Sequence, residues 1–137
     1  MIICDTSPLV AVLNKADAAH AVCLDLLEGH PGPLIVPSPV LSEVCYFLET
    51  RVGPAAEAQF LRSIVAGELK LAEITSADLE RMAELVTIYA DFPLGAVDAS
   101  VIALAERFNA LEIATLDRRH FNVVAPKHVP ALKLLPA

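Results

Sequence analysis

Four acidic side chains of this sequence, Asp5, Glu43, Asp98 and Asp117, could together support metal-dependent chemistry. No lysine or arginine neighbours Asp5, Glu43 or Asp98 in the sequence, so a cluster of these carboxylates would lack its own positive charge. Hard divalent cations take oxygen ligands, and Mg²⁺ commonly binds one or two carboxylates together with waters and substrate phosphates. A cluster of this kind favours metal-assisted phosphoryl transfer or phosphodiester hydrolysis.

The start of the chain predicts how the first of these acids is held. Residues 2–4 are apolar and suit a short strand that is buried on both faces, and Asp5 stands where that strand ends. Ser7 is a good N-cap and Pro8 suits the first helical position, so a helix is expected to begin at once. A carboxylate is therefore predicted between a buried strand and a helix start.

The other three acids occupy equivalent places in the predicted elements. Glu43 lies in the first turn or so of the helix after a strand at 34–36, Asp98 begins a helix, and Asp117 follows a strand at 113–116. In a parallel sheet of this kind the helices run antiparallel to the strands, so helix N-termini and strand C-termini share an edge. Ligands bind at that edge in open parallel sheets. The four carboxylates are thus expected to meet, and their repulsion should raise the pKa of at least one.

Strands and helices alternate along the whole chain, which predicts an α/β fold with a central, mostly parallel sheet flanked by helices. Neither repeats nor a linker divide residues 1–137, so a single domain is expected. Thr75 is predicted to cap a long helix to about Ala90, with Asp78 in the capping-box position. The segment from 123 to 135 is expected to add one short strand.

The composition excludes several classes of protein. The chain is 55 % hydrophobic and 20 % charged, which is typical of a compact globular protein and not of a disordered one. No apolar run is long enough to span a bilayer, and Asp5 interrupts the N-terminal apolar run too early for a signal peptide. The three cysteines form no close-spaced metal motif and are interpreted as buried thiols of a cytoplasmic protein.

The net charge of −7 is unevenly distributed, because residues 118–137 contain four basic side chains and no acid. This basic segment is either a solvated tail or a local phosphate contact beside the acidic site, in which case Arg118 and Arg119 are the candidates. A protein this acidic is not expected to bind nucleic acid by its overall charge alone.

Each candidate also has a simpler interpretation. Asp98 could be only an N-cap, Asp117 only a turn residue or cap, and Glu43 only a surface residue. The four histidines have no ligand-like spacing and are interpreted as structural or solvent-exposed. His120 has the best case for another role, because it follows Asp117 by three residues.

The order and spacing of the acids resemble those of PIN-domain ribonucleases, specifically the VapC-type toxins of bacterial toxin–antitoxin pairs. The resemblance runs from Ile2 to about Val124. It implies a PIN-like fold and a Mg²⁺-dependent endoribonuclease, with Mn²⁺ as a substitute metal. The segments that carry it are MIICDTSPLVAVL, PSPVLSEVCYFL, FPLGAVDASVIALAERF and IATLDRRHF.

The resemblance also implies roles for individual residues. Asp5 and Asp98 would be the main Mg²⁺ ligands, and the other two acids would complete the set directly or through water. Thr6 and Thr115 match positions where the family commonly has a hydroxyl that orients an acid. Many relatives carry a further acid shortly before Asp98, and the nearest one here is Asp91.

The resemblance further implies partners. The protein would be a homodimer, would act on RNA and would be inhibited by a cognate VapB-type antitoxin. A helix or extended tail of that antitoxin is expected in an apolar groove walled by the helices after Pro39 and Pro54, with one of its basic residues reaching the acidic pocket.

Two other functions compete with this interpretation. An aspartyl-phosphate phosphatase or a receiver-like domain also places an aspartate after a strand. The phosphatase pattern requires a second aspartate two residues after Asp5, where this chain has Ser7, and the acidic pair and late lysine of a receiver are not evident. A binding module on a degenerate nuclease fold would be expected to lack one or more of the acids, and all four are present.

Overall fold

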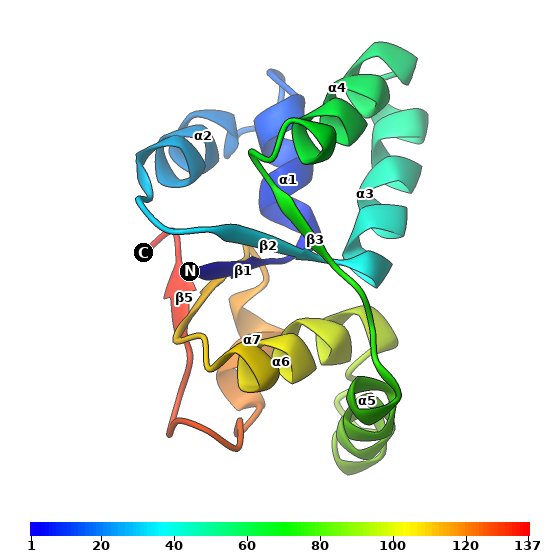
Figure 1. Ribbon diagram of the computed structural model, residues 1–137, viewed down its shortest axis with the longest axis vertical. Helices are drawn as coiled ribbons and strands as arrows, with labels where there is room; N and C mark the ends of the chain where they lie inside the picture. Colours follow the sequence, from blue (N-terminus) through cyan, green and yellow to red (C-terminus); the bar gives the residue numbers. More distant parts are fainter.

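A five-stranded parallel sheet with helices on both faces forms the centre of the protein, as a computed structural model of residues 1–137 shows (Figure 1). The α/β fold expected from the sequence is confirmed. The strands are β1 (Ile2–Cys4), β2 (Leu34–Pro37), β3 (Lys70–Ala72), β4 (Glu112–Ala114) and β5 (Lys133–Leu135). The helices are α1 (Thr6–Leu13), α2 (His20–Gly29), α3 (Ser38–Arg51), α4 (Pro54–Val65), α5 (Ser76–Ile88), α6 (Ala96–Phe108) and α7 (Arg118–Val123).

The strand order is β3-β2-β1-β4-β5, and every neighbouring pair is parallel. The connections from β1 to β3 carry α1 to α4 on one side of the sheet, and those from β3 to β5 carry α5 to α7 on the other side (Figure 1). The direction of winding therefore reverses between β1 and β4. In open α/β sheets such a reversal opens a crevice beyond the carboxyl ends of the two strands.

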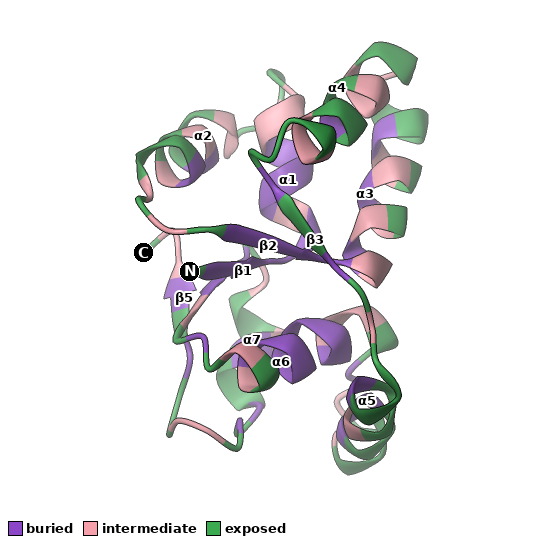
Figure 2. Ribbon diagram, viewed as in Figure 1, coloured by how far each residue is buried: buried purple, intermediate pink, exposed green.

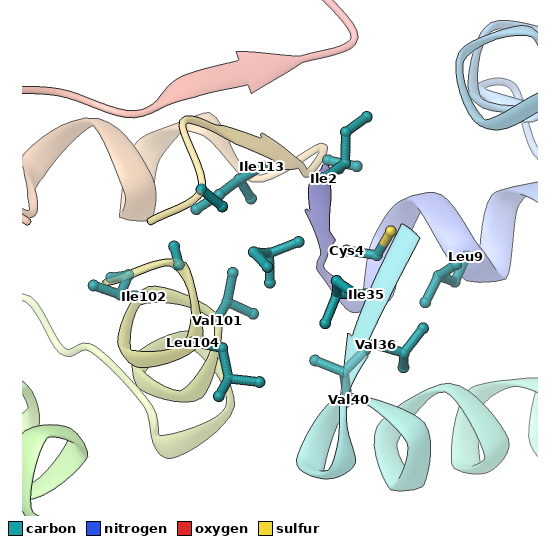
Figure 3. Close-up of a cluster of buried hydrophobic side chains, with 14 of the residues drawn as sticks. Ile2, Cys4, Leu9, Ile35, Val36, Val40, Val101, Ile102, Leu104 and Ile113 are labelled. Atoms are coloured by element: carbon teal, nitrogen blue, oxygen red, sulfur yellow. The ribbon is translucent and has the colours of Figure 1, made fainter. Parts of the chain in front are cut away.

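Strand β1 lies in the middle of the sheet and is completely enclosed. Ile2, Ile3 and Cys4 have no exposed surface, because helices cover both faces of the strand. This burial explains why β1 is a continuous apolar run and does not alternate with polar residues. Side chains from β1, β2, β4, α1, α3 and α6 meet in one core (Figure 3), and the purple of buried residues is concentrated at the sheet and the inner helix faces in Figure 2.

Helix α6, which carries Asp98, is fixed to its neighbour α5 by a bidentate ion pair. Arg81 donates from Nε to Glu106 Oε1 at 2.8 Å and from Nη2 to Glu106 Oε2 at 2.9 Å. Both side chains are nearly buried, at 12 and 11 % exposed. At the start of α5, the predicted capping box between Thr75 and Asp78 is confirmed, with both reciprocal hydrogen bonds present.

Three local predictions were wrong. Helix α1 begins at Thr6, so Ser7 does not cap it; the Ser7 hydroxyl instead accepts a hydrogen bond from the Leu116 N–H at 3.1 Å. Helix α6 begins at Ala96 and not at Asp98. Helix α7 was not expected, and it occupies part of the segment that was interpreted as a tail.

The expected short strand near the end of the chain is present as β5, which pairs with β4. All three cysteines are free thiols; Cys4 and Cys23 are buried, as expected, whereas Cys45 is only half-buried. None of the helices is both long enough and apolar enough to cross a membrane.

Candidate active site

Asp5 is held at the carboxyl ends of β1 and β4 by residues distant in sequence. Its backbone N–H donates to the Ala114 carbonyl at 2.9 Å, which extends the pairing of the two strands by one residue. The Thr115 hydroxyl donates to Asp5 Oδ2 at 2.8 Å. Only 5 % of Asp5 is exposed, so this residue is buried at the edge of the sheet and does not lie on the surface.

Asp117 reaches the same edge through the turn that follows β4. Its backbone N–H donates to the Thr115 hydroxyl oxygen at 3.0 Å, so Thr115 links the two acids. The Asp117 side chain caps α7 by accepting from the His120 N–H at 3.3 Å. The capping interpretation of Asp117 is therefore confirmed. Its second carboxylate oxygen, Oδ2, faces another side chain of the site.

That side chain is His120, which lies between two of the predicted acids. Its Nδ1 atom is 2.6 Å from Asp117 Oδ2 and 3.2 Å from Asp98 Oδ2. Neither contact has the alignment of a hydrogen bond, so the Nδ1 atom has no hydrogen-bond partner in the protein. Asp98 is the third residue of α6, with Gly95 as the N-cap, and it therefore does not have the N-cap role that the sequence allowed.

The placement of His120 is the main feature of the site that sequence interpretation missed. The other three histidines, His20, His30 and His128, are structural, since each contacts a backbone carbonyl or a carboxylate outside this site. The only signal for His120 was its separation from Asp117 by three residues, which places both side chains on one face of a single helical turn.

Glu43 belongs to the same electrostatic cluster. It lies in the second turn of α3, beyond the carboxyl end of β2, and its side chain is half-buried. Its negative charge contributes to raising the pKa values of Asp5 and Asp98. The structure thus brings all four predicted acids to one edge of the sheet.

Burial and repulsion together perturb two of these carboxyl groups. Burial, followed by the charges of Asp98 and Glu43, raises the pKa of Asp5 to about 6, against the opposing hydrogen bonds from the Thr6 backbone N–H and the Thr115 hydroxyl. The pKa of Asp98 is also raised, mainly by burial. Pairs of perturbed carboxyl groups in a crevice are characteristic of functional sites.

The donor atoms suit a hard divalent cation. All four acids offer oxygen ligands, and the Thr6 hydroxyl beside Asp5 is buried without any hydrogen-bond partner in the protein. No three histidine, cysteine, aspartate or glutamate side chains are grouped so that they could hold a metal ion by themselves. Mg²⁺ is the divalent cation that such a set suits best, because it keeps several waters and uses few protein ligands.

The two candidate phosphate ligands differ in their surroundings. Arg118 donates from Nη2 to the backbone carbonyls of Leu134 and Pro136, which ties α7 to β5. Arg119 is exposed, and its guanidinium lies 5.8 Å from the ring centroid of Phe92. Arg119 is therefore the more available of the two for a ligand.

Thr115→Val should raise the pKa of Asp5 further, because the hydroxyl hydrogen bond favours the charged form of that carboxylate. A pH titration of the Asp5 carboxyl carbon by NMR measures the change. Thr115→Ser retains the hydroxyl and should keep the wild-type value. Equal pKa values in the valine and serine variants would show that the 2.8 Å contact does not stabilise the carboxylate.

Comparisons with known proteins agree with this geometry. The PIN domain family matches residues 2–126. Ribonuclease VapC26 of Mycobacterium tuberculosis is 38 % identical over 124 residues, which cover 90 % of this chain and 92 % of that protein.

Solved structures share the fold. The crystal structure of Mycobacterium tuberculosis VapC20, a sarcin-ricin loop cleaving toxin, has a TM-score of 0.77 and 22 % identity over 82 % of this chain and 87 % of that one. VapBC2 from Rickettsia felis, bound to a promoter DNA fragment, has a TM-score of 0.64 and 22 % identity over 98 and 97 % of the two chains. With a family match over nearly its whole length and a relative this similar, the chain belongs to the PIN-domain family, in its VapC-type branch.

Proposed function

We propose that this protein is a Mg²⁺-dependent endoribonuclease and the toxin of a toxin–antitoxin pair. The observation that carries the proposal is the convergence of Asp5, Asp98, Asp117 and Glu43 at the reversal point between β1 and β4. The 38 % identity to a ribonuclease of the same family supports RNA as the substrate.

In this proposal, Asp5 and Asp98 hold the metal ion, and Glu43 and Asp117 complete the acidic set directly or through water. A bound divalent ion lowers the pKa of water so that it can attack a phosphodiester, and it offsets charge on the phosphate. The protein's own contribution is orientation. Thr115 fixes Asp5 Oδ2 at 2.8 Å and receives the Asp117 N–H at 3.0 Å, so one hydroxyl sets the relative position of two acids.

We propose a VapB-type antitoxin as the partner. Related folds have been solved as toxin–antitoxin complexes, including one from Klebsiella pneumoniae. A largely apolar cavity of about 700 Å³ lies between α1, α2 and α4, lined by residues such as Leu13, Leu27 and Phe60. Helix α3 does not line this cavity, and none of the four acids does, so it is not the groove between the helices after Pro39 and Pro54 that was expected from the sequence.

Two further features of the proposal are the cytoplasm as the location and a homodimer as the assembly. The three free thiols agree with a reducing compartment. Helix α5 presents apolar side chains to solvent, with Leu79 56 % and Ile88 64 % exposed, and a second subunit would remove such surface from water.

The competing functions are disfavoured by particular residues. A phosphatase needs an acid at position 7, and Ser7 instead accepts a hydrogen bond from the Leu116 N–H. A degenerate binding module has no requirement for acids at the ends of several strands and helices, and all four acids are present here.

Cleavage of a labelled single-stranded RNA tests the proposal. We expect products with Mg²⁺ or Mn²⁺ and none with EDTA. Cleavage that persists undiminished in EDTA would contradict the metal dependence. Binding without cleavage in either metal would favour the binding module.

A further inference from the structure

A half-buried aromatic ring, Phe92, contacts His120, which in turn contacts two of the four acids. Phe92, in the loop between α5 and α6, meets the ring of His120 edge-on, with centroids 5.1 Å apart and planes at 72°. The same His120 contacts Asp98 and Asp117 at 3.2 and 2.6 Å. Phe92 therefore stands at the rim of the site, close to any phosphate that the acids and their metal would engage.

Beside Phe92 lies an arginine, Arg119, that forms no salt bridge. A polyanion that enters this crevice meets four carboxylates on a protein of net charge −7, so local cations must offset the repulsion. Arg118 is occupied by the backbone carbonyls of Leu134 and Pro136. Arg119 is exposed, has no carboxylate partner within 4.0 Å and lies against the Phe92 ring.

An aromatic ring paired with a free guanidinium is suited to an unpaired nucleotide. Proteins hold single-stranded nucleic acid by stacking bases on aromatic side chains while basic groups follow the backbone. Bases inside a duplex are already stacked and cannot reach such a ring. The rim residues thus match unpaired RNA better than a double helix.

We propose that Phe92 and Arg119 form a nucleotide-binding subsite for single-stranded RNA beside the cleavage site. The base stacks on Phe92, and Arg119 leaves the ring to contact the adjoining phosphate. This subsite rests on the proposed ribonuclease function and adds the residues that select an unpaired nucleotide next to the reacting phosphate.

Binding measurements in the Asp98→Asn protein, in which cleavage should be strongly reduced, test the two residues separately. Fluorescence anisotropy compares a short single-stranded RNA with a backbone of equal length that is abasic throughout. Phe92→Leu should weaken RNA binding about 5- to 150-fold, which is the size of the contribution from one stacked base, and should leave abasic binding unchanged. Phe92→Tyr should restore RNA binding, which separates loss of stacking from loss of folding.

Arg119→Gln should weaken binding of both ligands and reduce the slope of log K against log salt by about 0.7, as expected for one lost phosphate contact to a single strand. The matched control is Arg51→Gln at the far end of α3, where an exposed arginine also lies over a phenylalanine, Phe47, at 4.2 Å. The control should change neither affinity nor slope.

The proposal is overturned if Phe92→Leu affects RNA and the abasic backbone equally or not at all. It is also overturned if Arg119→Gln changes the salt slope no more than Arg51→Gln does. Cleavage by the wild-type protein is measured independently. If the wild-type protein cleaves RNA but the variants bind RNA normally, only the proposed subsite is contradicted. If the variants show the expected binding losses but the wild-type protein does not cleave, the ribonuclease function is contradicted and the subsite is supported.

Discussion

Asp98→Asn should reduce RNA cleavage by about 10²- to 10³-fold, the loss typical of removing a group that organises charge in the transition state. Asp98 lies in the first turn of α6, 19 % exposed, with its Oδ2 atom 3.2 Å from His120. Asparagine has nearly the same shape but no negative charge, so it cannot hold a metal ion as a carboxylate does. Initial rates with saturating Mg²⁺ measure the loss.

The fold should survive this substitution, since the N-cap of α6 is Gly95, the first-turn charge is worth about 0.3–1 kcal/mol, and asparagine keeps a side-chain oxygen that can accept from the Gly95 N–H. Asp25→Asn is a matched control, because it removes an exposed carboxylate from α2 on the opposite side of the sheet. The control should cleave normally. If Asp98→Asn also keeps near-normal turnover, Asp98 is not a metal ligand.

Removal of the Asp5 charge should stabilise the metal-free protein at neutral pH. The folded-state pKa of Asp5 is about 6, above its ordinary value of 3.8, because burial and the charges of Asp98 and Glu43 disfavour ionisation. Between these two pH values the folded state binds more protons than the unfolded state. The free energy of unfolding therefore falls as the pH rises through about 4 to 6, and it is level above that range.

The size of this effect is at most roughly 3 kcal/mol, since each pKa unit corresponds to about 1.4 kcal/mol. Asp5→Asn lacks the titration, so its advantage over the wild type should be small at low pH and largest above pH 6. Mg²⁺ or Mn²⁺, by binding only the folded state, should restore stability to the wild type at neutral pH and do so much less in the variant.

Thermal melts below pH 4 and above pH 6, with EDTA or with Mn²⁺, check both expectations. Two results would count against the shared site: a variant no more stable than the wild type in EDTA at the higher pH, or an equal rise with Mn²⁺ in both proteins. Asp25→Asn again serves as the control, because an exposed carboxylate should alter neither the pH dependence nor the response to metal.

Much of the site was predictable because β-strand ends and helix starts share an edge in a parallel sheet. The apolar run of β1 allowed the position of Asp5 to be predicted, and the capping box at Thr75 allowed the start of α5 to be predicted, because both signals are local in the sequence. The expected rise in a carboxyl pKa is also found at Asp5. Its main cause, however, is burial, and repulsion between carboxylates is the smaller contribution.

Other features depend on contacts that no local pattern records. Helix α7 has only six residues, too few to show a hydrophobic period, and it is set by the Asp117 cap and by buried Phe121. Ser7 has the properties of an N-cap, but its hydroxyl is used by the Leu116 N–H more than 100 residues away. The 3.2 Å approach of His120 to Asp98 likewise joins α7 to the first turn of α6, a contact between segments that are separate in the sequence.

The bond between Thr115 and Asp5 joins residues that are 110 positions apart, and this separation has a consequence during translation. At about 5–20 residues per second, the ribosome needs roughly 5 to 20 s to progress from one to the other. Throughout that interval β1 lacks β4 beside it, and Asp5 has neither its hydroxyl donor nor Asp117 nearby. A nascent chain of this protein is therefore unable to assemble the crevice until most of it has been synthesised, which delays the appearance of any nuclease activity relative to the start of synthesis.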